Sequence, residues 1–315
     1  SLKKSLTNFK SFNYSETFKQ SFKIFVLYVS LTLFLFISLK LINLRTYDSF
    51  NIAMTIISSG GFLPVNDIGS IINTNFKEIV FSFLMLLPFF SLFLFYNIIF
   101  LKEKSLNFFA EDIYLFIYLL TLIVIFFIFF NFDYNFSTIF FSLASSMSNI
   151  GISLKNSPSN LWFLFLTIVI IGGSFFSTSS GIRFMKIYFL FRYSLNEILS
   201  YSRPNNVYTN KFHLIDSSIE QKDINRYFLS VVIFILSFLT ITSLLSIFDT
   251  SFEESFKLSI LTLMNTVNSP MYDLNNFDFL ELNYYSKLTM IVFMIIGRVE
   301  LLTILIIIKK FIFKS

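Results

Sequence analysis

The stretch Ile57-Ser58-Ser59-Gly60-Gly61-Phe62 decides the fold, because it places a small, polar, glycine-bearing turn between two apolar segments. Related turns follow at Ser148-Asn149-Ile150-Gly151-Ile152 and at Thr266-Val267-Asn268-Ser269-Pro270. Each turn comes after a long apolar segment and a short half-polar one, and a second long apolar segment follows it. The pattern thus occurs three times, which is typical of one structural unit repeated around an axis.

The composition places these units in a membrane. The chain is 55% hydrophobic, has a mean hydropathy of +0.72 and contains 47 Phe, whereas only 14% of its residues are charged. Soluble domains carry roughly 25% charged residues. Six apolar stretches approach or exceed the roughly 20 residues that a bilayer requires. They lie at about 23–43, 79–101, 113–132, 160–192, 227–248 and 286–308.

A polar turn cannot face lipid, because its N–H and C=O groups would lack hydrogen-bond partners. Such backbone is tolerated at membrane depth where protein buries it or where it lines a water-filled cavity. Three units of helix, re-entrant turn and helix therefore predict an all-α membrane protein in which each unit forms one wall of an ion pore.

The elements of each unit can be placed along the chain. We expect short helices at 50–57, 136–147 and 252–265, each between a long outer helix and a long inner helix. Asp48 or Ser49, Asn135 and Asp249 are candidate caps of the short helices, and Pro88 is expected to kink the first inner helix. We divide the chain into residues 1–110, 111–223 and 224–315. The first part includes a cytoplasmic entry segment, and the second includes a cytoplasmic connector.

The short helices indicate cation binding. A helix C-terminus carries roughly half a negative charge, and the turn that follows can offer carbonyl oxygens in place of an ion's hydration shell. The candidate ion-binding residues are Ser58, Ser59, Gly60, Gly61, Ser148, Asn149, Ile150, Gly151, Val267, Asn268 and Ser269.

A second polar stretch interrupts the apolar span at 160–192 and is a candidate gate. The expected gate residues are Gly172, Gly173, Ser174, Ser177, Thr178, Ser179, Ser180 and Gly181, together with Arg298 of the last span. Packing of small residues between helices is the alternative explanation of this stretch. Arg298 and Glu300 lie inside the last span, where charge is costly. We expect Arg298 to donate hydrogen bonds to the broken segment, and Glu300 to bind elsewhere.

Charge sets the orientation and narrows the class of protein. With the N-terminus in the cytoplasm, seventeen Lys and Arg fall in cytoplasmic segments and six in outer ones, which is a positive-inside distribution. The net charge of +5 is therefore attributed to the orientation of the chain in the membrane, and no nucleic-acid partner is expected. Because the chain has no Cys and its single His213 lies in a polar connector, we expect no enzyme site and no covalent cofactor.

Four passages resemble the Trk/Ktr/HKT superfamily of potassium transporters, most of all the bacterial Trk-type membrane subunit. Residues 57–62 are similar to its Ser-Thr-Gly-Gly-Phe filter, and 172–183 to its intramembrane Gly-Gly…Gly-Ser-Thr-x-Gly-Gly-Ile-Lys loop. Residues 203–207 resemble its His-Pro-Asn-Ala-Val passage, and Gly297-Arg298-Val299-Glu300 resembles its Gly-Arg-Leu-Glu. The resemblance covers nearly the whole chain.

The resemblance implies a pseudo-fourfold cation pore of which this chain holds the last three of four units. It also implies potassium uptake across a bacterial cytoplasmic (inner) membrane, with both ends of this chain in the cytoplasm, in a homodimer that binds a cytosolic nucleotide-binding regulatory subunit. We expect a truncated sequence, since it starts at Ser1 where the family's second unit begins.

Two departures from the family's filter sequence leave alternative functions open. The third turn has Ser269 where the family has the filter glycine, and the second turn has Ile152 where Phe is common. In relatives, such a serine is associated with an altered preference between sodium and potassium. A sodium-permeable relative and a non-conducting structural subunit are therefore the alternatives to a potassium transporter.

Overall fold

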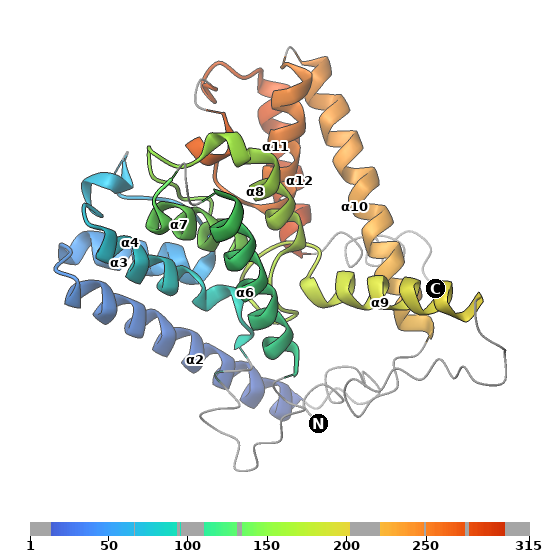
Figure 1. Ribbon diagram of the computed structural model, residues 1–315, viewed down its shortest axis with the longest axis horizontal. Coiled ribbons are helices and arrows are strands. Elements are labelled where there is room, and N and C mark those ends of the chain that lie inside the picture. Colours follow the sequence, from blue (N-terminus) through green and yellow to red (C-terminus); the bar gives the residue numbers. More distant parts are fainter. Residues whose placement is uncertain are drawn as a thin grey trace.

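The computed structural model describes residues 14–65, 67–92, 95, 110–130, 134–201, 221–248, 250–274 and 277–299. The regular elements within these ranges are all helical. Figure 1 shows three successive groups of helices: α2 to α4, α6 to α9, and α10 to α12. In each group a long helix precedes a short one, and the chain then continues through a non-helical turn.

The first group contains α2 (Tyr14–Leu41), α3 (Thr46–Ser58) and α4 (Asn75–Met85). A tight turn with Asn43 in the left-handed region (φ 63°) reverses the chain, so that α3 packs back along α2. The reversal comes earlier than expected, and α3 starts at Thr46. The prediction that Asp48 or Ser49 caps α3 is therefore wrong: Arg45 occupies the cap position without a side-chain capping bond.

The first inner helix also ends earlier than expected. We predicted a kinked helix to residue 101, but α4 stops at Met85 and is followed by a 3-10 turn, Leu87–Phe89. Pro88 lies in this turn. Proline has no N–H to donate and its ring collides with the carbonyl four residues earlier, which explains a break in place of a kink.

The second group contains α6 (Ala110–Phe130), α7 (Phe136–Met147), α8 (Trp162–Ile171) and α9 (Phe184–Tyr201). The short helix α7 has the bounds expected from the sequence. The predicted interruption of the inner span at residues 172–181 is confirmed as a non-helical segment between α8 and α9. In Figure 1, α9 runs across the lower end of α10 and does not continue the direction of α8.

The third group contains α10 (Gln221–Ile247), α11 (Phe252–Met264) and α12 (Tyr284–Val299). Helices α10 and α12 both pack against α11. The expected cap Asp249 lies outside the described residues. Ser251 caps α11 in a capping box, in which its hydroxyl accepts a hydrogen bond from the Glu254 N–H and its own N–H donates to the Glu254 carboxylate.

The short helices form the centre of the protein. Residues 139–147 of α7 and 257–264 of α11 are all buried, and the short helices share one apolar core with the helices around them. The long helices instead expose large apolar side chains, such as Phe34 of α2 and Phe129 of α6. A wide apolar surface around a partly polar centre is the arrangement expected in a bilayer.

Three of the described helices are long and apolar enough to cross a membrane: residues 21–41, 111–129 and 223–247. They correspond to the three outer spans expected from the sequence. The other three expected spans do not form long single helices within the described residues, because the first two are interrupted and the last is described only to residue 299.

The capping box of α11 makes a testable prediction. Replacing Ser251 with Ala removes the acceptor for the Glu254 N–H and should lower the unfolding free energy by about 1 kcal/mol, measured by denaturant unfolding in detergent. Asn135→Ala is the matched control, since Asn135 occupies the cap position of α7 without a side-chain capping bond. Equal losses in the two variants would contradict the prediction.

Candidate functional site

The three short helices end in the same backbone geometry. Ser59, Asn149 and Asn265 each adopt a left-handed conformation, with φ of 49°, 57° and 51°. The N–H of the following residue then donates to the carbonyl five residues back: Gly60 to Thr55, Ile150 to Ser145 and Thr266 to Leu261. The three turns thus begin in the same way.

The left-handed residue also anchors two of the turns. The Asn149 Nδ2 donates to the Val169 carbonyl of α8 at 3.1 Å, and the Asn265 Nδ2 donates to the Met294 carbonyl of α12 at 2.9 Å. In each case the amide ties the end of a short helix to the helix that follows its turn. This contact fixes where the turn's backbone lies.

The three turns meet at one place. A Cβ added to Gly61 would lie 2.2 Å from the Ile150 carbonyl oxygen and 2.5 Å from Val267 Cγ2. One added to Gly151 would lie 2.2 Å from the Val267 carbonyl oxygen. Both glycines have positive φ, 73° and 83°. Glycine is therefore required at these two positions for close backbone approach as well as for conformation.

The shared geometry corrects the alignment of the third turn. Gly61 and Gly151 each lie two residues after the left-handed residue, and in the third turn that position is Val267. The prediction that Ser269 replaces the filter glycine is therefore wrong. Val267 has no positive φ. The third turn thus presents an isopropyl group where the other two turns have bare backbone.

Several buried oxygens around the turns have no protein hydrogen-bond partner. They are Ser59 Oγ, Ser145 Oγ, Asn149 Oδ1, Asn268 Oδ1 and Ser269 Oγ. Buried polar atoms are normally paired, so such a group of acceptors needs water or an ion. By contrast, the hydroxyls of Ser58 and Ser148 donate back to carbonyls of their own helices.

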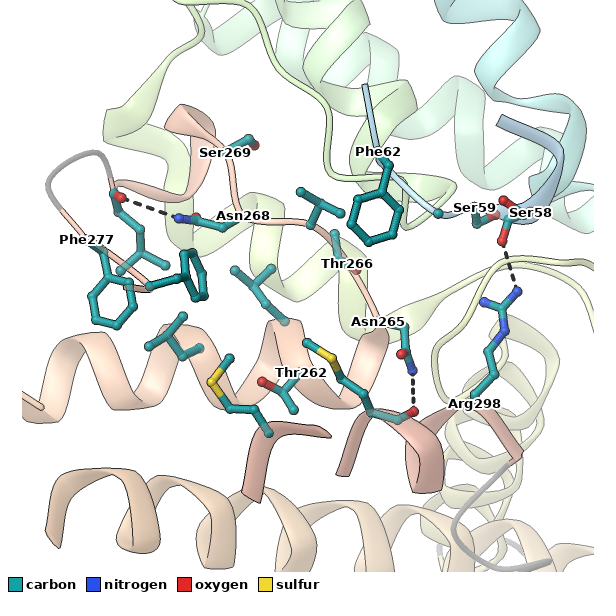
Figure 2. Close-up of a pocket in the computed structure, with 18 of the residues that line it drawn as sticks. Ser58, Ser59, Phe62, Thr262, Asn265, Thr266, Asn268, Ser269, Phe277 and Arg298 are labelled. Carbon is teal, nitrogen blue, oxygen red and sulfur yellow. Dashed lines mark hydrogen bonds between the residues drawn. The ribbon is translucent and has the colours of Figure 1, made fainter. Parts of the chain in front are cut away.

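A cavity of about 980 Å³ opens beside the turns. Figure 2 shows its polar lining, which includes Ser58 and Ser59 of the first turn and Asn265, Asn268 and Ser269 at the third. Apolar side chains of α11, α12 and the segment between them line the rest. The cavity therefore lies between the first and third turns, on the side away from the second.

The broken segment, residues 172–181, is a closed loop. Its two ends pack backbone to backbone: a Cβ on Gly172 would lie 2.2 Å from the Ser180 carbonyl oxygen, and one on Gly181 would lie 2.6 Å from the Gly172 Cα. Hydrogen bonds from Ile182 N to the Ile170 carbonyl and from Phe184 N to the Gly173 carbonyl close its neck.

Arg183 fills the loop. Its Nη1 donates to the Ser174 and Ser179 carbonyls at 3.0 and 2.7 Å and to the Ser177 hydroxyl at 3.0 Å. The guanidinium thus donates hydrogen bonds to loop carbonyls that have no partner within a helix. The hydroxyls of Ser177 and Ser179 also bond to each other at 2.8 Å.

The loop is joined to the break in the first inner helix. Ser174 N donates to the Phe89 carbonyl, and Leu92 N donates to the Phe176 carbonyl, both at 3.2 Å. Two adjacent carboxylates at the start of α6 accept the neighbouring N–H groups. Asp112 accepts from Ser91 N at 3.0 Å, and Glu111 accepts from Phe175 N at 2.6 Å.

Arg298 connects the loop to the first turn. Its Nη2 donates to the Ser58 carbonyl at 2.9 Å and its Nη1 to the Ser180 hydroxyl at 3.3 Å. Figure 2 shows the side chain reaching from α12 toward Ser58. The hydrogen bond to the broken segment was expected and the one to Ser58 was not. Gly297 allows this placement, because a Cβ there would lie 2.2 Å from the Leu263 carbonyl oxygen of α11. Glu300 lies outside the described residues.

The structure therefore brings together Ser58, Ser59, Gly60, Gly61, Ile150, Gly151 and Val267 at the turns, and groups Gly172 to Gly181 in the loop. Sequence reasoning missed the carboxylates of Glu111 and Asp112 and the buried ammonium of Lys257. Charged residues at the edge of an apolar span, or within a short helix, were the signal that could have found them.

The outer loops also connect the first and second turns. Lys155 Nζ lies 2.9 Å from the Asp67 carboxylate. This bond, together with the Gly69 N–H, holds the pKa of the Asp67 carboxyl below its usual value. Among the described residues, no group of three or more acidic, His or Cys side chains is arranged as a metal site.

Comparisons with known proteins support the fold. No protein-family model matches the chain, and no curated protein matches it by sequence. The crystal structure of the potassium transporter TrkH from Vibrio parahaemolyticus is similar to it, with a TM-score of 0.79 and 21% identity over 94% of this chain. The matched region is 65% of the TrkH chain. The chain thus shares the all-helical fold of this structure, as the Trk/Ktr/HKT resemblance implied.

The contact between turns makes a second prediction. Gly151→Ala should destabilise the protein by about 1–3 kcal/mol or more. The added methyl group would meet the Val267 backbone, and Gly151 has a left-handed φ that alanine rarely adopts. Gly60→Ala is the matched control, since its added Cβ would lie 3.0 Å from a serine hydroxyl that can rotate away. Thermal unfolding in detergent measures both variants. A Gly151→Ala protein as stable as Gly60→Ala would show that the turns do not touch.

Proposed function

We propose that the chain lines a pathway for monovalent cations, with potassium as the expected ion, across the cytoplasmic membrane of a bacterium. The turns form the ion-selective constriction and residues 172–181 form a gate beneath it. Both ends of the chain lie in the cytoplasm in this proposal. The transported ion is the substrate, and no covalent cofactor takes part.

The observation that carries the proposal is the meeting of three turns, each of which follows the C-terminus of a short helix. The end of each short helix directs partial negative charge to the place where Gly61, Gly151 and Val267 meet. Five buried side-chain oxygens of these turns and of α7 have no protein hydrogen-bond partner. A dehydrated cation is the ligand that suits acceptors and helix C-termini together.

The gate is supported by a network of hydrogen bonds. Residues 172–181 are non-helical backbone whose carbonyls Arg183 binds, and Arg298 joins this loop to the first turn. Because Glu111 and Asp112 hold the loop and the first inner helix at adjacent sites on α6, we propose that these segments move as one unit when the path opens.

The cavity between the first and third turns requires a cover, because its polar backbone cannot face lipid. We propose that a further helix–turn–helix unit of the full-length protein fills it and completes a pseudo-fourfold pore. Consistent with this, the matched region is only 65% of the TrkH chain. A homodimer with a cytosolic nucleotide-binding regulatory subunit is the proposed assembly.

One observation favours a second candidate, a pathway that passes sodium as well. Val267 occupies the position of the glycines in the other turns and has no positive φ. The carbonyls of the third turn therefore cannot be arranged as those of the first two are. A ring with three or four unlike positions coordinates potassium less selectively than a uniform one.

Ion flux in vesicles tests the proposal. Full-length protein reconstituted into liposomes should carry ⁸⁶Rb⁺ and K⁺ down a gradient, and its expression should restore growth at low potassium to bacteria that lack potassium uptake. Protein-free liposomes are the control. Flux of Na⁺ equal to that of K⁺ would favour the second candidate. Folded protein without cation flux would contradict the proposal and support a non-conducting subunit.

Arg298 provides a test of gating. Arg298→Gln removes the guanidinium that joins the loop to Ser58, and with it a positive charge that repels cations from the path. Basal ⁸⁶Rb⁺ leak should therefore rise several-fold. Arg226→Gln is the matched control, since Arg226 pairs with Asp223 on the exposed surface of α10. An unchanged leak in folded Arg298→Gln protein would rule out a gating role.

A further inference from the structure

The third turn lacks the feature that shapes the other two. The first and second turns each contain a glycine with positive φ, whereas the third has Val267 at that position. Asn268 nevertheless holds this turn on its far side, where its Nδ2 donates to the Leu274 carbonyl at 3.4 Å. Side-chain contacts therefore hold the third turn in place, whereas a glycine with positive φ shapes each of the other two turns.

Lys257 is the most unusual of these side chains. It lies on the short helix α11, and its side chain is only 2% exposed. Its Nζ lies 2.7 Å from the Glu253 carboxylate and 3.1 Å from the Asp273 carboxylate, and it donates to the Asp273 carbonyl at 3.2 Å. The same ammonium lies 4.3 Å from the ring centroid of Trp162 at the start of α8.

These contacts enclose the third turn. Lys257 precedes the turn and Asp273 follows it, so their bond closes the chain segment that contains residues 266–270. Asp273 has a left-handed backbone, φ 56°, directly after the 3-10 turn Pro270–Tyr272. The bond from Nζ to its carbonyl oxygen fixes that conformation. Trp162 carries the link to the second group of helices.

We infer that Lys257 is a positioning residue that holds the third turn against the other two and thereby sets which monovalent cation the pathway prefers. The inference rests on the proposed function. Burial of an ammonium is costly unless it is paired, and a lysine that only stabilised the fold could be replaced by an apolar side chain. Here the ammonium binds the backbone that leaves the turn, so its loss releases the carbonyls that face the ion.

The experiment measures the K⁺/Na⁺ permeability ratio of full-length protein from reversal potentials in planar bilayers. Lys257→Met should lower the ratio by roughly tenfold, which corresponds to ~1.4 kcal/mol. Lys257→Arg should keep most of the permeability ratio of the unmodified protein, because a guanidinium can also donate to Asp273 and Glu253. The ratio does not depend on how many molecules are folded, so a purely structural loss would leave it unchanged.

Lys287→Met is the matched control. Lys287 is also an outer lysine that donates to a backbone carbonyl, that of Leu280 at 2.9 Å, but it is only half-buried and lies at the start of α12. Its replacement should leave the ratio as in the unmodified protein. Asp273→Asn tests the same link should Lys257→Met not fold, and it should lower the ratio in the same direction.

Each outcome decides the inference. A conducting Lys257→Met protein with an unchanged K⁺/Na⁺ ratio would overturn the inference and leave the proposed function in place. If Lys257→Met does not fold, an unchanged ratio in Asp273→Asn would overturn the inference in the same way. An unmodified protein that passes no cation would overturn both. A ratio that falls in Lys257→Met and returns in Lys257→Arg supports positioning by Lys257.

Discussion

The structure depends on keeping three stretches of non-helical backbone away from lipid. Each stretch follows a short helix, and each would lose several hydrogen bonds if it faced hydrocarbon. The chain solves this by directing the three turns at one another, so that the Gly61 backbone packs on Ile150 and that of Gly151 packs on Val267. The long helices then present their apolar side chains outward. The same arrangement gathers the C-terminal ends of the short helices at one place, and the cation binding that we propose there would follow from this packing.

Local sequence predicted much of this arrangement. Composition and the three-fold recurrence of a polar turn were sufficient for the class of fold, and the bounds of α7 were correct because its apolar run is clearly delimited. Residues 172–181 were recognised as broken because eight of these ten residues are small or hydroxylated and do not sustain a regular helix well. The start of α3 and the end of α4 were not predicted correctly, because the early chain reversal at Asn43 was not foreseen and Pro88 was expected to kink the helix and instead ends it. The partners of Arg298 and the carboxylate contacts of Glu111 and Asp112 join residues far apart in sequence, which periodicity cannot reveal.

The third turn shows how far sequence repeats can diverge while the geometry persists. Counting from the sequence placed Ser269 opposite the glycines, whereas the backbone places Val267 there, because the left-handed Asn265 defines the register. Loss of a glycine would be expected to relax the turn. Hydrogen bonds from Asn265, Asn268 and Lys257 instead fix it from both ends. The three turns thus share their left-handed first residue but differ two residues later, where a glycine shapes two of them and side-chain contacts hold the third.

The most direct measurement is a crystal structure of the full-length protein in a thallium salt, because Tl⁺ substitutes for K⁺ and scatters anomalously. If the turns bind the transported cation, an anomalous peak should lie among the carbonyl oxygens where Gly61, Gly151 and Val267 meet. An ordered structure with the turns in this arrangement and no anomalous peak among them would contradict a cation pathway through this site.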